Sequence, residues 1–157
     1  MLGTSVAAVK STLQRARARL EEVAPIPEGI IEPTEPQARE LLGQYIAGFE
    51  NSDIAALERA LRTDAAIDLV GTRTWFSGRE TCLCFLAHVL GLPGDWRMTP
   101  TLANGQPATA TYHRDGAGSY QAWGAAVLTV TSTGVTRITV FAGGPALVAQ
   151  FGLPPAV

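Results

Sequence analysis

A chain of 157 residues with a net charge of −2 has room for one domain with a sizeable core and a modest appendage. Its composition, 46% hydrophobic and 17% charged, excludes an intrinsically disordered protein. No apolar run approaches the roughly 20 residues that span a bilayer, and the start does not resemble a signal peptide, so no membrane partner is expected. Cys82 and Cys84 lie too close together on a predicted helix for a structural disulfide, which favours the cytoplasm as the compartment.

The charge is distributed unevenly along the chain. Residues 1–20 contain Lys10, Arg15, Arg17 and Arg19 and no acid, whereas all 14 Asp and Glu residues follow them. A basic N-terminal segment on an otherwise acidic protein indicates two roles, one of them near a polyanion.

The first predicted element is an amphipathic helix over residues 4–22. Its apolar stripe recurs at spacings of three and four residues and consists of Val6, Val9, Leu13, Ala16 and Leu20. Residues 23–33 are acidic and rich in proline, which predicts an extended linker.

Residues 34–157 begin with apolar stripes that predict three helices. The second helix follows Asp53, and its stripe runs as far as Leu61. The third follows Ser77, whose spacing from Glu80 is that of a capping box.

The remaining segments have the patterns of strands. A short apolar strand is predicted at 65–70, and four β-rich runs at 96–103, 106–113, 119–131 and 135–141. Asn104-Gly105 is a typical two-residue hairpin turn, and Gly-containing loops separate the other runs. Helices followed by a four-stranded antiparallel meander predict an α+β fold. A strongly curved sheet closed by helices would form a cone with an apolar mouth that can bind a small molecule.

Two stretches resemble a known protein family. Residues 2–20, with Gly3 as the turn glycine and Leu13-Gln14-Arg15-Ala16-Arg17 near the end, resemble the last helix of the DNA-binding domain of extracytoplasmic-function sigma factors. The rest is similar to the SnoaL-like extension that a subset of these sigma factors carries. Three motifs support that similarity: Trp75-Phe76-Ser77-Gly78-Arg79, Ala103-Asn104-Gly105-Gln106-Pro107-Ala108 and Phe151-Gly152-Leu153-Pro154.

The resemblance implies an architecture. We expect a SnoaL-like, cone-shaped, curved antiparallel sheet covered by helices and preceded by a single basic amphipathic helix. Residues 1–22 would be the remnant of a sigma helix-turn-helix domain, 23–33 a linker, and 34–157 the SnoaL-like domain. The polymerase-binding domain of the family is missing from the sequence. Met1 is therefore expected to be an internal methionine of a longer reading frame, or the chain a truncated remnant.

The resemblance also implies a function. The chain would be the C-terminal regulatory portion of an alternative sigma factor in transcription initiation, whose full-length form binds core RNA polymerase and promoter DNA. The residues expected to contact bases or phosphates are Ser5, Lys10, Ser11, Gln14, Arg15 and Arg17. The alternative for this segment is a solvated amphipathic helix without a DNA partner. No metal site and no cofactor are expected.

A candidate pocket is the second site that the sequence indicates. Residues expected to line or rim it are Asp68, Trp75, Phe76, Trp96, Tyr112, His113, Gln121 and Trp123. Strand alternation places Thr111 and His113 on the face opposite Tyr112, and it places Trp123 and Ala125 on one shared face. Which face points inward stays open, and aromatic residues at such spacings are more often core than ligand cage.

Two alternatives to the regulatory function remain. A stand-alone isomerase or cyclase would use Asp68 with His113 or His88 as general base, and it requires these side chains in one enclosed cavity. Because such a combination is common by chance, no catalytic residue is assigned and an enzyme is not expected. The other alternative is a non-catalytic domain that binds a small-molecule ligand or forms a homodimer.

Overall fold

The computed structural model of the protein describes residues 10–15, 18 and 36–157. Residues 10–15 are helical, in agreement with the N-terminal helix predicted over 4–22. The remainder of that predicted helix and the predicted linker 23–33 lie outside the described residues, apart from residue 18, which is also helical.

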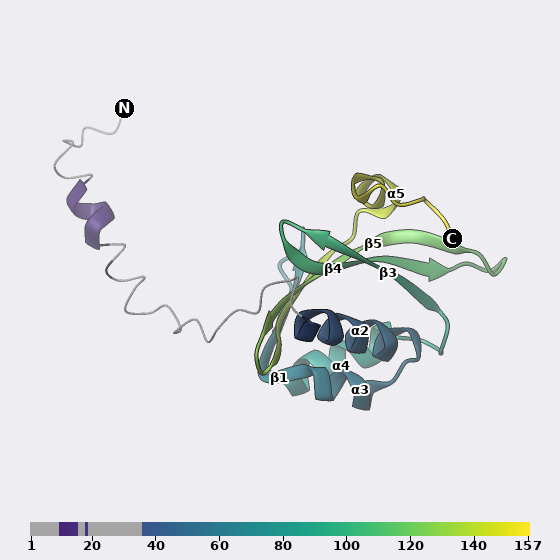
Figure 1. Ribbon diagram of the computed structural model, residues 1–157, viewed down its shortest axis with the longest axis horizontal. Coiled ribbons are helices and arrows are strands. Elements are labelled where there is room, and N and C mark those ends of the chain that lie inside the picture. The colour runs from purple at the N-terminus through teal and green to yellow at the C-terminus, as the bar shows by residue number, and fades with distance from the viewer. Residues whose placement is uncertain (1–9, 16–17, 19–35) are drawn as a thin grey trace.

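Within residues 36–157, six strands form one curved sheet in the order β2-β1-β6-β5-β4-β3 (Figure 1). The four strands of the predicted meander are present almost residue for residue. The strands are β1 (Leu61–Val70), β2 (Trp75–Ser77), β3 (Trp96–Ala103), β4 (Gln106–Arg114), β5 (Tyr120–Thr131) and β6 (Gly134–Phe141).

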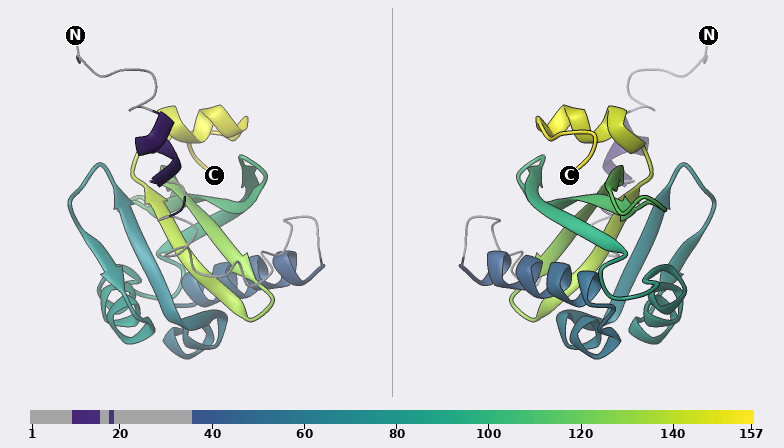
Figure 2. Two further views of the ribbon diagram at one scale, coloured as in Figure 1. Left: turned by 90° about the vertical axis from the view of Figure 1, so that its left-hand side faces the viewer. Right: turned by 90° about the vertical axis from the view of Figure 1, so that its right-hand side faces the viewer.

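The helices divide between the two faces of the sheet. Three of them, α2, α3 and α4, lie together beneath one face, and α5 packs on β5 at the other face (Figures 1 and 2). The helices of this region are α2 (Pro36–Glu50), α3 (Ile54–Ala60), α4 (Arg79–Val89), α5 (Gly144–Val148) and the 3₁₀ turn η1 (Ala149–Phe151). This order and layering confirm the predicted α+β fold.

One strand pairing differs from the antiparallel sheet that was predicted. Strands β3 to β6 pair antiparallel as a meander, but β1 lies parallel to β6, with Ile67 opposite Ile138. Parallel neighbours need a long crossover connection, and here β2, α4 and strands β3 to β5 lie between β1 and β6 in the chain. The sheet is therefore mixed, because β1 adds to the β6 edge of the meander in parallel and β2 forms the outer edge beyond it.

The β3–β4 hairpin turn is the one that the sequence predicted. Asn104 has φ 50° and Gly105 has φ 79°, so both central residues occupy the left-handed region. Ala103 pairs with Gln106 across this two-residue loop. Positive φ at both positions is what makes Asn-Gly favourable there.

Two predicted boundaries were wrong. Helix α3 ends at Ala60, and Leu61, which was expected on the helical stripe, is the first residue of β1 and is buried. A leucine at this position would be buried at the end of a helix or at the start of a strand, so the apolar stripe could not distinguish the two structures. The N-cap of α4 is Gly78, with no side-chain cap, because Ser77 is the last residue of β2.

The sheet has apolar side chains on both faces, but the two sides differ in size. The main core lies between the sheet and helices α2–α4 and includes Tyr45, Phe49 and Ile67. A smaller cluster that includes Tyr112 and Val148 lies at the opposite face, beneath α5. Alternate residues of one strand therefore serve two separate cores.

Candidate functional site

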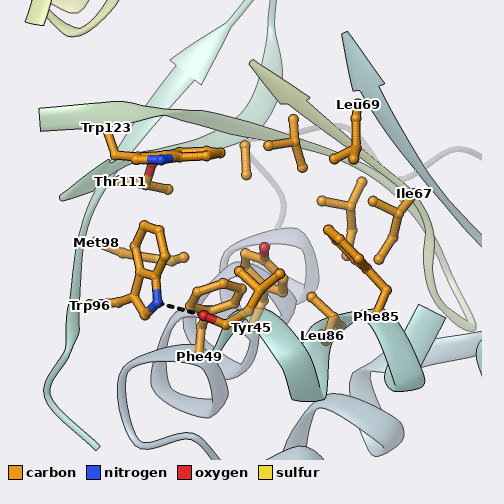
Figure 3. A pocket seen from close by; sticks show the side chains of 14 residues that line it. Tyr45, Phe49, Ile67, Leu69, Phe85, Leu86, Trp96, Met98, Thr111 and Trp123 are labelled. Atoms are coloured by element: carbon orange, nitrogen blue, oxygen red, sulfur yellow. Dashed lines mark hydrogen bonds between the residues drawn. The ribbon is translucent and has the colours of Figure 1, made fainter. Parts of the chain in front are cut away.

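A cavity of ≈ 150 Å3 lies inside the main core, between the sheet and helices α2 and α4 (Figure 3). Its wall is almost entirely apolar and strongly aromatic. The lining residues are Tyr45, Phe49, Ile67, Leu69, Phe85, Leu86, Val89, Trp96, Met98, Thr111, Trp123, Ala126, Ile138 and Val140.

Local periodicity explains how these side chains converge. Tyr45 and Phe49 lie one helical turn apart on α2, and their ring centroids are 5.7 Å apart. Ile67 and Leu69 alternate along β1, so both point to the helical side of the sheet. The cavity is thus built mainly from buried residues, with Trp123 38% exposed, and its walls belong to the helices and strands of the fold.

Trp96 is held in place from several directions. Its indole Nε1 donates a hydrogen bond to the Val89 carbonyl at 3.0 Å, which joins β3 to the end of α4. Its ring meets Phe49 edge-on at 5.6 Å and Trp123 edge-on at 5.5 Å. These contacts fix the orientation of the indole, so one wall of the cavity is preorganised (Figure 3).

A β-bulge brings Trp123 to the cavity. Thr111 of β4 pairs with Gly124 of β5, but the next residue, Tyr112, pairs with Ala122, so Trp123 is an extra residue in β5. A bulge of this kind redirects a side chain and changes the alternation on either side of it.

The shared face predicted for Trp123 and Ala125 was wrong for this reason. Trp123 lines the cavity, whereas Ala125 and Val127 line a separate groove on the other face. Nothing in the sequence marked the extra residue, although Gly124 beside it is a residue type that often accompanies bulges.

The interior of the cavity disfavours charge. Burial raises the pKa of the Tyr45 hydroxyl well above its ordinary value of 10, so this group stays neutral.

The hydroxyl of Thr111 is the polar group of greatest interest. Thr111 is 4% exposed, and its Oγ1 has no hydrogen-bond partner among the described residues. A buried hydroxyl without a partner is uncommon and needs an explanation.

Three of the eight predicted pocket residues lie at or next to the cavity. Trp96 and Trp123 line it directly. Phe76 stacks on the cavity residue Phe85, with centroids 4.3 Å apart, and so supports the wall from behind.

His113 and Gln121 lie outside the lining. His113 is exposed, and its ring meets the edge of Trp96 at 4.7 Å. Gln121 is also exposed and donates a hydrogen bond to Asp115 at 3.0 Å. His88, the other histidine considered, is exposed on α4, with its Nδ1 2.7 Å from the Cys84 carbonyl oxygen.

The remaining three predicted pocket residues, Asp68, Trp75 and Tyr112, lie away from the cavity. Asp68 lies between Ile67 and Leu69 on β1, points to the opposite face and forms an ion pair with Arg137. Trp75, its neighbour across the β1–β2 pairing, is 65% exposed.

Tyr112 belongs to the small core beneath α5. There its hydroxyl donates to the Pro154 carbonyl at 3.1 Å. The structure therefore separates Asp68 and Tyr112 from the cavity that Trp96 and Trp123 line.

Sequence reasoning did not single out Thr111 as a site residue. Strand alternation places Thr109 and Thr111 on the same face, so the sequence pattern does not separate the two threonines. In the structure Thr109 Oγ1 donates to the Thr99 carbonyl at 3.2 Å, whereas Thr111 has no such partner among the described residues. Only the three-dimensional arrangement distinguishes the two.

Part of the candidate DNA-binding set can be placed. Lys10, Ser11, Gln14 and Arg15 are helical and exposed. Ser5 and Arg17 lie outside the described residues.

The residues that the structure describes lack two kinds of feature. No group of three His, Cys, Asp or Glu residues there could hold a metal ion. No helix in the same residues has the length and hydropathy to cross a bilayer.

Comparison with known structures first defines the class of fold. A protein from Kribbella flavida DSM 17836, described as a candidate ketosteroid isomerase, superposes with a TM-score of 0.54 and 26% identity, over 71% of this chain and 81% of that one. An NTF2-like protein of unknown function from Burkholderia xenovorans LB400 superposes with a TM-score of 0.58 and 16% identity, over 76% and 95%. The domain therefore has the NTF2/SnoaL-like fold, as the sequence predicted.

The comparison of sequences then identifies the relatives. No family model matches the chain. The extracytoplasmic-function RNA polymerase sigma factor SigG of Mycobacterium tuberculosis is 34% identical over 156 residues, which are 98% of this chain. The match spans 42% of the length of SigG. The chain is thus similar to part of an extracytoplasmic-function sigma factor, and the predicted resemblance is confirmed.

Proposed function

We propose that this chain is the regulatory portion of an alternative sigma factor that acts in transcription initiation in the cytoplasm. Residues 1–22 would supply a promoter-recognition helix, 23–33 a linker, and 34–157 a domain that modulates promoter use. The observation that carries the proposal is the 34% identity to SigG over 98% of the chain. That match includes both the basic segment and the NTF2/SnoaL-like domain.

The DNA-binding part of the proposal rests on the basic segment. Lys10 and Arg15 are exposed on a helical stretch with Ser11 and Gln14, so their side chains are free of the domain core. Helix-turn-helix proteins place such residues against base edges and phosphates in the major groove. Ser5 and Arg17 complete the proposed contact set.

The regulatory part rests on the character of the domain. The lining of its cavity contains neither a carboxylate nor an imidazole among the described residues. Asp68 and His113, which an isomerase would need together, lie on opposite faces of the sheet. These positions weigh against a joint acid–base role for Asp68 and His113, and they support a regulatory function over an enzymatic one. In a sigma factor the domain would act by contact with the DNA-binding or polymerase-binding regions, at a reach set by residues 23–33.

The proposal is tested by transcription in vitro with purified core RNA polymerase. The protein is expressed from the reading frame extended upstream of Met1, and promoter-dependent transcripts are measured with Lys10→Ala/Arg15→Ala and with Arg59→Ala as the matched control. Arg59 is an exposed arginine on α3, outside the proposed contact set. We expect only the double variant to lose promoter binding. In that variant, the slope of the logarithm of the binding constant against the logarithm of salt concentration should be smaller in magnitude by roughly 1 to 2.

Two results would contradict the proposal. One is an upstream frame that encodes no polymerase-binding region. The other is an equal effect of the Arg59 control, which would indicate general electrostatics and not a recognition helix.

A further inference from the structure

The cavity in the main core has the size of a small-molecule site. Its volume, ≈ 150 Å3, is comparable with the engineered apolar cavities that bind benzene. Most drug-sized ligands occupy pockets of roughly 300 Å3 or more, so a fitting ligand here is about one ring in size. The cavity is bounded by helices and strands that also carry the core, so it is preformed.

The wall excludes charged ligands. Thirteen of the fourteen lining residues are hydrophobic or aromatic, and Thr111 is the remaining one. An ion transferred into such surroundings loses its hydration without compensation. The raised pKa of Tyr45 reports the same environment. A ligand of this cavity is therefore neutral and mostly apolar.

Thr111 adds a single polar requirement. Its Oγ1 is buried, lies at the cavity beside the Trp123 indole and has no partner among the described residues (Figure 3). A threonine hydroxyl can both donate and accept, so one hydroxyl on a ligand would satisfy it. Thr109, two residues earlier on the same face, is fully buried and bonded to the Thr99 carbonyl. The unpartnered hydroxyl is thus specific to the position that meets the cavity.

We propose that this cavity is a binding site for a small neutral monocyclic alcohol or phenol. The ring of the ligand lies between α2 and the indoles of Trp96 and Trp123, and its hydroxyl bonds to Thr111 Oγ1. The aromatic edges of Phe49, Trp96 and Trp123 supply the apolar contact, and Thr111 supplies the selectivity for a hydroxyl. This inference goes beyond the sigma-factor function, since binding requires neither polymerase nor DNA.

The test uses phenol and toluene, which have nearly the same shape and differ by a hydroxyl in place of a methyl. The purified chain is titrated with each probe, and the indole N–H signals of its three tryptophans are followed by NMR. Trp96 and Trp123 should shift, and the exposed Trp75, assigned with Trp75→Phe, should not. The measured quantity is the ratio of the toluene Kd to the phenol Kd.

Variants then isolate the hydroxyl. Thr111→Val keeps the shape and should lower that ratio about tenfold, because the hydrogen bond to phenol is lost. Thr111→Ser keeps the hydroxyl and should preserve the ratio. Thr109→Val is the matched control and should also preserve it.

Several outcomes would overturn the proposal. These are a failure of both probes to shift Trp96 and Trp123, a ratio unchanged in Thr111→Val, or an equal change in Thr109→Val. An unchanged ratio is also the result expected if a bound water already satisfies Thr111. Because none of these measurements involves polymerase, their failure leaves the transcription experiments above unaffected.

Discussion

The bulge in β5 makes a sharp prediction about Gly124. This residue is buried opposite Thr111, directly after the extra residue Trp123. A Cβ at this position would overlap the Phe141 carbonyl oxygen and lie 3.1 Å from the Phe141 carbonyl carbon. These are backbone atoms of the neighbouring segment, so no side-chain rotation can relieve the clash. Strands β5 and β6 would have to separate where the bulge forms.

The expected cost of Gly124→Ala is about 3 kcal/mol of unfolding free energy, the upper end for overpacking, since backbone must move. For a domain of this size that corresponds to a fall in Tm of roughly 10 °C. Gly43→Ala adds the same methyl group in the middle of α2, where a Cβ would meet nothing within 4 Å. That change should stabilise the protein by about 0.5–1 kcal/mol through helix propensity.

Urea denaturation of both variants, followed by circular dichroism at 25 °C, measures the two values under identical conditions. Opposite signs support the bulge geometry. If Gly124→Ala changes the unfolding free energy by less than about 0.5 kcal/mol, the close approach of β5 and β6 is wrong. The position of Trp123 in the cavity wall would then lose its support.

Three further predictions concern side chains. Thr111→Val should stabilise the free protein by about 1 kcal/mol, because it removes a buried hydroxyl without a partner, and Thr109→Val should destabilise it by a similar amount, both measured in urea. Burial raises the pKa of Tyr45, so the stability that this group contributes is complete below about pH 10 and falls above it. Tyr45→Phe should reduce that fall, which approaches about 1.4 kcal/mol of unfolding free energy per pH unit, and urea denaturation at a series of pH values measures it. Asp68→Asn should change stability by less than about 1 kcal/mol and leave phenol binding unchanged, because its ion pair is partly exposed on the far face; a clear loss of binding in NMR titration would contradict that placement.

Much of the fold could be predicted because hydrophobic periodicity is a local property. The four strands of the meander and the Asn104-Gly105 turn followed from alternation and turn chemistry. The parallel pairing of β1 with β6 could not be predicted in this way, because it depends on how distant segments meet. Leu61 shows the same limit at smaller scale, since burial alone does not separate a helix end from a strand start.

The candidate site was harder to predict than the fold. Trp96 and Trp123 are large aromatic residues, a type common in cavity walls, and both line the cavity although Trp123 is 38% exposed. Asp68 was a candidate because it is an acid on an apolar strand, but the face it occupies depends on the packing of its neighbours Ile67 and Leu69. Thr111 lies beside the bulge, and its lack of a partner among the described residues depends on three-dimensional packing that the sequence pattern does not encode.

The central claim is that residues 34–157 regulate a sigma factor, and removing them is the most direct measurement. Run-off transcripts made by core RNA polymerase are compared between the upstream-extended protein and the same protein ended at residue 33. The account predicts a change of at least about threefold in promoter-dependent transcript, with DNA binding retained by the basic helix. Equal transcript levels from the two proteins, at equal polymerase occupancy, would contradict it.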